Sequence, residues 1–191
     1  MTPFRDRSSS LVQRMIRGDG ACFDDVVAMY SEDVLRLCEL LLGDSEEAKD
    51  VLQEAMLRLV RTVREKKFRT ANGSIKGFLT TTARNLCVNR LSKKVDFRPI
   101  DEDDVYRHAS LHNSRTPDRI ADESRFESAF EDALTQLTDS QRTILVLHEV
   151  NGESQSEIAK SLNLSVECVR SHLYLARRKM RALLAPFAGG S

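Results

Sequence analysis

Residues 154 to 184 have the sequence SQSEIAKSLNLSVECVRSHLYLARRKMRALL, and this stretch decides the fold of the C-terminal part of the chain. Ser154 and Glu157 form a capping box, which predicts a short helix over Gln155 to Leu162. Asn163-Leu164-Ser165 is a three-residue turn, and Ser165 can cap a last helix that runs to about Leu184. Two helices joined by a tight turn, the second of them basic, predict a helix-turn-helix.

The last helix carries side chains that can contact DNA. Arginine can bind guanine through two hydrogen bonds, and Ser, His and Tyr can bond to bases or phosphates. The predicted set is Arg170, Ser171, His172, Tyr174, Arg177, Arg178 and Lys179. A small apolar core is predicted to hold the two helices together: Ala159, Leu162, Leu164, Val169, Leu173 and Ala176. The alternative is a generic pair of helices with a solvated basic face.

The rest of the chain is also predicted to be helical, because β-branched alternation is nearly absent. After residues 1–7, which we interpret as a polar tail, apolar periodicity predicts helices that stop at Gly18 and at Gly43. Ser45 is predicted to cap a third helix, and a fourth helix is predicted over about residues 74–94. Thr138 and Gln141 form a capping box, which predicts a further helix that ends at Asn151-Gly152.

The third helix has the strongest periodic signal. Its buried stripe is predicted to be Ala48, Val51, Leu52, Ala55, Met56, Leu59, Val60 and Val63. At about 100° per residue, five residues fall on the opposite side: Asp50, Gln53, Glu54, Leu57 and Arg61. An apolar Leu57 surrounded by polar groups is a candidate docking spot for a partner, although single exposed apolar residues are common.

The fourth helix presents Thr81, Asn85, Asn89 and Lys93 at a spacing of four residues. Asparagine is a poor helix former, so two on one face suggest a role beyond helix propensity. Their amides can bond to the exposed edges of single-stranded bases. Phe68 and the Asn72-Gly73 loop precede this helix, where an unstacked base could be held. The alternative is a capped loop beside a solvated face.

Charge and composition limit the classes of function that the chain can have. The net charge is zero, but residues 84–98 and 161–191 each contain five basic residues and one acidic residue. Between them, residues 101–132 contain ten acids and four arginines, which predicts a linker that avoids a polyanion. Hydrophobic residues make up 41% of the chain, no apolar run is long enough to span a membrane, and no signal peptide is evident.

No catalytic triad, metal cluster or phosphate-binding glycine loop is visible, so we expect no enzyme activity, no cofactor and no metal. The four cysteines form no CxxC pair and stand in apolar helical contexts. They are predicted to be buried thiols of a cytoplasmic protein.

Several of these strings resemble the extracytoplasmic-function (ECF) sigma factors of the sigma-70 family. Gly18-Asp19 with Phe23, Glu47 to Glu54, and Gly77-Phe78-Leu79 with Ala83-Arg84-Asn85 resemble region 2. Glu157-Ile158-Ala159 with Val169-Arg170-Ser171 and Ala176-Arg177 resembles region 4. Phe78 stands where the family usually has tryptophan, Cys168 where threonine is frequent, and Leu175 where a basic residue often lies.

The resemblance implies an all-α protein of two small helical domains on a flexible linker: region 2 over 1–95, an acidic linker over 96–125, and region 4 over 126–191. It implies binding to core RNA polymerase through its β′ clamp helices and β flap, recognition of promoter DNA, and an anti-sigma factor as a further partner. The residues opposite the third helix's stripe would dock on polymerase. The implied −10 set is Phe68, Asn72, Arg84, Asn85, Asn89 and Lys93.

Two alternatives remain at this point. A free-standing helix-turn-helix regulator would bind duplex DNA without polymerase, and would not need the face with Asp50 and Glu54. A sigma mimic that only titrates an anti-sigma factor would need neither the arginines of the last helix nor the paired asparagines. The presence of all three sets favours a working sigma factor.

Overall fold

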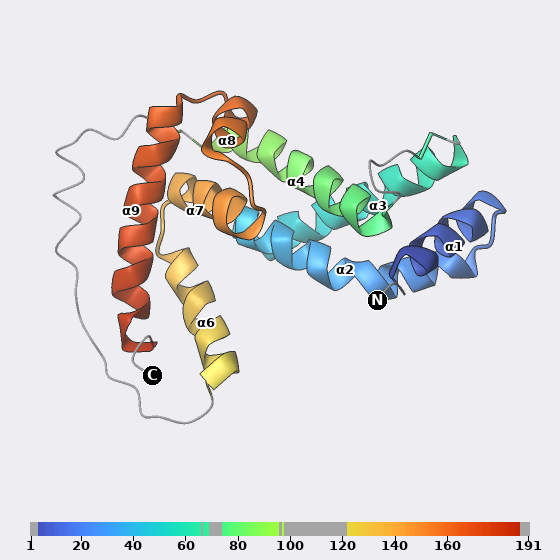
Figure 1. The fold of residues 1–191 in the computed structure, drawn as a ribbon, viewed down its shortest axis with the longest axis horizontal. Helices are drawn as coiled ribbons and strands as arrows, with labels where there is room; N and C mark the ends of the chain where they lie inside the picture. The colour runs from blue at the N-terminus through green and yellow to red at the C-terminus, as the bar shows by residue number, and fades with distance from the viewer. Residues whose placement is uncertain (1–3, 66, 69–73, 96, 98–121, 188–191) are drawn as a thin grey trace. The chain divides into compact units, whose positions relative to one another are not determined.

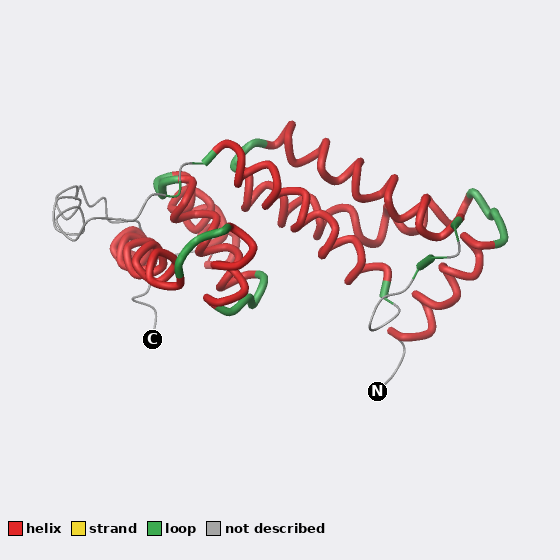
Figure 2. Tube along the Cα trace, turned by 90° about the horizontal axis from the view of Figure 1, so that it is seen from above, coloured by secondary structure: helices red, strands yellow, loops and turns green. Residues whose placement is uncertain are grey.

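The computed structural model describes residues 4–65, 67–68, 74–95, 97 and 122–187. Within these ranges the chain forms helices and connecting loops, with no strand (Figure 2). The chain divides into two compact units, residues 1–91 and 92–191. The all-helical, two-unit fold predicted from the sequence is therefore confirmed. Most of the predicted linker lies outside the described residues.

Unit 1 contains α1 (Phe4–Ile16), α2 (Ala21–Leu42), α3 (Ser45–Arg64) and α4 (Ile75–Lys94), coloured blue to green in Figure 1. The prediction of a polar tail over residues 1–7 is wrong in part, because α1 already begins at Phe4. Farther along α1, Leu11 and Met15 are buried at a spacing of four residues.

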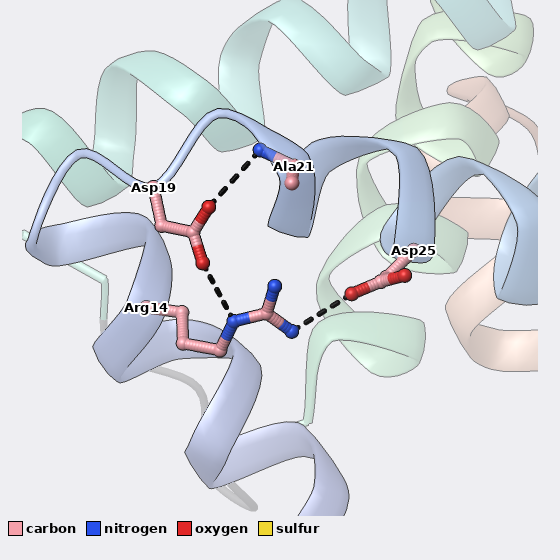
Figure 3. Close-up of polar contacts among 4 residues, drawn as sticks. All are labelled: Arg14, Asp19, Ala21 and Asp25. Carbon is pink, nitrogen blue, oxygen red and sulfur yellow. Dashed lines mark hydrogen bonds and ion pairs between the residues drawn. The ribbon is translucent and has the colours of Figure 1, made fainter.

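The turn between α1 and α2 is fixed by charged groups (Figure 3). Arg14 donates from Nε to Asp19 and from Nη1 to Asp25, both at 2.8 Å. Asp19 also accepts from the backbone N–H of Ala21, at 3.1 Å. The hydrogen bond from Arg14 lowers the pKa of Asp19 below its usual value. Asp19, in the Gly18-Asp19 string, thus links the end of α1 to the start of α2.

The boundary between α2 and α3 depends on two local signals. Gly43 adopts φ 66°, and its N–H bonds to the carbonyl of Glu39, which ends α2 as predicted. The prediction of Ser45 as the cap of α3 is wrong by one residue. Asp44 has the extended backbone of an N-cap and accepts from the N–H of Glu47 at 2.9 Å, whereas Ser45 donates to the Glu39 side chain.

The core of unit 1 lies along the predicted stripe of α3. The stripe residues Ala48, Val51, Ala55, Met56, Leu59 and Val63 are buried, whereas Leu52 and Val60 are half-buried. α4 adds Ile75, Leu79, Ala83 and Cys87, and its Arg90 donates to the carbonyl of Glu47 on α3.

The four cysteines are buried free thiols, as predicted. A hydrogen bond between the Cys38 and Cys87 thiols, with burial, raises the pKa of Cys87.

Unit 2 contains α6 (Asp122–Thr135), α7 (Asp139–Leu145), the π-helical turn η1 (Val146–Val150), α8 (Gln155–Leu162), α9 (Val166–Leu184) and the 3-10 turn η2 (Ala185–Phe187). α6, α7 and α8 all pack on α9, the red helix of Figure 1. α7 and η1 are continuous and end before Gly152, which has φ 73°. The predicted helix ending at Asn151-Gly152 is confirmed, with a π turn as its last part.

The helix-turn-helix is formed by α8 and α9. Both predicted capping boxes, at Thr138 and at Ser154, are present, and Ser165 caps α9 by accepting from the N–H of Cys168 at 3.1 Å. Asn163 takes the left-handed conformation that the turn requires, with φ 57°. The predicted core residues are buried except Leu164, which is half-buried. The small core therefore sets the position of α9 against α8.

We expect Ser154→Ala to destabilise unit 2 by about 1 kcal/mol, because it removes one half of the capping box. Ser154 accepts from the N–H of Glu157 through Oγ, and Glu157 accepts from the N–H of Ser154 at 2.8 Å. Ser156→Ala, at an exposed position of the same helix, is the control. Urea unfolding followed by circular dichroism measures both variants, and equal midpoints for the two would contradict the role of the cap.

Candidate nucleic-acid interface

One accessible face of α9 carries four residues of the predicted DNA-contacting set. Arg170 and Tyr174 are exposed and Ser171 and Arg178 are half-buried. Residues 170, 174 and 178 follow at four-residue steps, so they lie within about 80° of one another around the helix axis. Tyr174 is 58% exposed, so its ring and hydroxyl are accessible on the surface of unit 2. These four side chains are therefore accessible in unit 2, and their contact with DNA stays a prediction.

The prediction that His172 contacts DNA is wrong in this structure. His172 is 5% exposed and lies on the side of α9 that faces the interior of the unit. It follows Arg170 by two residues, which rotates it about 200° away from that arginine. Leu175 and Cys168, where the family often has other residues, are buried as well. None of these three side chains can reach a base edge without displacing the helix.

Two further members of the predicted set are held by residues of the same unit. Arg177 donates from Nε and Nη2 to Glu149 of η1, at 2.8 and 2.6 Å. The ammonium of Lys179 donates to the backbone carbonyl of Gln136, the residue that follows α6. Both cations lie at the edges of the exposed face of α9 and bond to segments that precede it in unit 2.

An apolar groove of about 500 Å³ lies beside α9, and sequence reasoning missed it. Its lining includes Phe130, Leu134, Val146, Met180 and Leu184, with Glu149, Arg177 and Arg181 among the charged lining residues. Val150, 50% exposed, is also part of the lining. The signal available in the sequence was the set of apolar residues near the end of α9, Met180, Leu183 and Leu184, which lies beyond the helix-turn-helix core.

In unit 1, the predicted docking face of α3 is solvent-accessible. Asp50, Gln53, Leu57 and Arg61 are exposed, and Leu57 is 51% exposed. Glu54 differs, because it is half-buried and bonds to Arg58 at 2.6 Å. A second Glu54 oxygen lies 4.0 Å from Arg90 of α4. Four residues thus present a continuous surface, whereas Glu54 also links α3 to α4.

The predicted −10 residues lie on and beside α4. Thr81, Asn85, Asn89 and Lys93 are all exposed on one face, as the four-residue spacing predicts. The Asn85 side-chain oxygen accepts from Arg84 Nη1 at 3.0 Å. Phe68 is half-buried, and the centroid of its ring lies 5.5 Å from the centroid of the Phe78 ring. Phe68 therefore packs at the start of α4. Asn72 lies outside the described residues.

In the described part of the chain no helix is long and apolar enough to cross a membrane.

A helix-turn-helix whose second helix exposes arginines and a tyrosine places unit 2 in the class of DNA-binding domains. The comparisons with known proteins give the family. Residues 26–96 match the family model described as sigma-70 region 2, and residues 127–180 match sigma-70 region 4. The chain belongs to the ECF sigma factors of the sigma-70 family.

Two curated relatives span nearly the whole chain. The RNA polymerase sigma-H factor of Pseudomonas aeruginosa is 30% identical over 189 residues, 95% of this chain and 96% of the relative. The ECF RNA polymerase sigma factor SigW of Bacillus subtilis is 25% identical over 183 residues, 91% of this chain and 94% of the relative. The sigma factor RpoE of Bartonella quintana, solved with the anti-sigma factor NepR, shares the fold with a TM-score of 0.50. It is 18% identical, over 85% of this chain and 96% of that one.

Proposed function

We propose that this sigma factor divides promoter recognition between its two units. The exposed face of α3 binds core RNA polymerase, α4 with Phe68 captures a base of the −10 element, and α9 recognises the −35 element. The observation that carries the proposal is the accessible set on the second helix of a helix-turn-helix, with Arg170 and Tyr174 exposed and Ser171 and Arg178 half-buried. A regulator that acts without polymerase would not need the exposed face of α3.

The domain limits that we propose follow from this division. Residues 1–95 form region 2, residues 96–125 form an acidic linker, and residues 126–191 form region 4. The factor itself catalyses no reaction, because polymerase makes the RNA. It acts in the cytoplasm, where polymerase and chromosome are found. Binding of an anti-sigma factor stays a prediction.

The two arginines of this set, Arg170 and Arg178, differ in the part of the DNA that they can reach. Arg170 is near the N-terminal end of the helix, where recognition helices contact base edges. Arg178 is two turns later, where phosphates are reached. Arginine at the first position can bind guanine through two hydrogen bonds, which gives sequence preference. Arginine at the second position adds affinity for any sequence.

We expect Arg170→Ala to weaken binding of a matched −35 duplex by about 1–3 kcal/mol and to affect a scrambled duplex much less. Arg178→Ala should weaken both equally and reduce the salt slope by about 0.9. Matched duplexes come from selection with the reconstituted holoenzyme, and binding is measured across a salt series. Lys160→Ala, exposed on α8, controls for loss of one positive charge. Equal losses on both duplexes for Arg170→Ala would contradict base recognition by that arginine.

A further inference from the structure

The ion pair between Glu149 and Arg177 has no place in the recognition scheme above. Arg177 uses two of its nitrogens on a single carboxylate oxygen of Glu149, at 2.8 and 2.6 Å. The Arg177 and Glu149 side chains remain 40% and 49% exposed, respectively. Exposed ion pairs contribute little to stability, because water screens the charges and two long side chains must be ordered. The pair therefore has short hydrogen bonds but contributes little to the free energy of unfolding.

The fold of unit 2 does not depend on this pair. η1 is anchored by the buried side chains of Val146 and Leu147. α9 is anchored by the buried Leu173 and Ala176, and it packs against α7 and α8. Burial of these apolar groups contributes far more to stability than an exposed pair. A change at Glu149 is thus expected to alter charge and contacts at the surface while α9 stays in place.

Arg177 also lies close to the face of α9 that carries the DNA-contacting residues. It follows Arg170 by seven residues, which places the two arginines within about 20° of each other around the helix axis. It follows Tyr174 by three residues, so it lies about 60° from the tyrosine. A guanidinium at this position can reach a phosphate next to the bases that Arg170 contacts, provided that it is released from Glu149.

We propose that Glu149 competes with DNA phosphates for Arg177 and thereby limits the affinity of unit 2 for duplex DNA of any sequence. This inference rests on the proposed function of α9. Carboxylate and phosphate oxygens both accept paired hydrogen bonds from a guanidinium, so one arginine cannot serve both fully. Glu149 also places a negative charge next to the DNA backbone. Loss of that charge frees Arg177 for one more phosphate contact.

Glu149→Gln tests the competition, because it keeps the size of the side chain and removes its charge. Binding of the full chain to duplex DNA is measured by fluorescence anisotropy at increasing salt. At about 50 mM salt we expect up to about fivefold tighter binding, the amount that release of an exposed ion pair allows. One added phosphate contact steepens the salt slope by about 0.9, so the gain shrinks about 3.5-fold by about 200 mM salt.

Asp139→Asn controls for loss of a paired negative charge, because Asp139 bonds at 2.7 Å to Arg142, whose side chain is only 12% exposed. In an Arg177→Ala background, Glu149→Gln should no longer steepen the salt slope. If Glu149→Gln binds DNA no more tightly than wild type, the competition between Glu149 and phosphate is overturned, while the proposed function of α9 stands. An identical gain in affinity from Asp139→Asn has the same consequence. If no variant binds DNA even at the lowest salt, the proposed contact of α9 with DNA falls too.

Discussion

Asp50→Arg is expected to abolish binding to core RNA polymerase while unit 1 stays folded. Asp50 is exposed on α3, on the side opposite the buried Ala48, Ala55 and Leu59, so its side chain contributes nothing to the core. Reversal of a charge inside a complementary interface costs several kcal/mol, because like charges then face each other. We therefore expect a loss of roughly hundredfold or more in affinity.

A pull-down with core enzyme measures binding, and a thermal melt by circular dichroism checks the fold. Glu32→Arg, an equal charge reversal at an exposed position of α2, is the control. Glu54→Arg is a less clean test, because it would place a third cation beside Arg58 and Arg90. Undiminished binding by Asp50→Arg would remove the exposed face of α3 from the polymerase interface.

Asn85→Ala is expected to impair promoter opening while sparing polymerase binding and closed-complex formation. Extrusion of a base costs a few kcal/mol, and a protein site must offset that cost to keep the strands apart. The exposed amide of Asn85 can bond to the edge of such a base, and Arg84 holds the amide oxygen at 3.0 Å. Loss of these bonds should lower open-complex occupancy by about tenfold or more.

Permanganate footprinting on duplex templates and on templates with a pre-melted −10 bubble measures opening. The bubble should partly rescue Asn85→Ala, because part of the unpairing cost is already removed. Ser92→Ala, at another exposed position of α4, is the control. Normal opening of the duplex template by Asn85→Ala would exclude Asn85 from the site that holds the base.

The sequence was sufficient for most of the secondary structure, and for the faces of single helices. Both capping boxes, the left-handed Gly43 and the stripe of α3 depend on residues at most about four positions apart, or on one repeated spacing. The one-residue error at Ser45 arose because Asp44 and Ser45 are both good caps, and backbone geometry chooses between them. The prediction for His172 fails because its angle on the helix places it beside Val169 and Ala176, on the buried side of α9.

By itself, then, the sequence determined most of the helices, both capping boxes, the helix-turn-helix and the family to which the chain belongs. Tertiary structure alone decided which charged groups are engaged: Arg90 bonds to a carbonyl 43 residues away, Arg177 to a carboxylate 28 residues away, and Lys179 to a carbonyl 43 residues away. Helical periodicity gives the direction of a side chain from its own axis and nothing about the neighbouring helix. Ion pairs across helices and the groove beside α9 exist only once the helices have packed, because packing sets which side chains come within hydrogen-bonding distance.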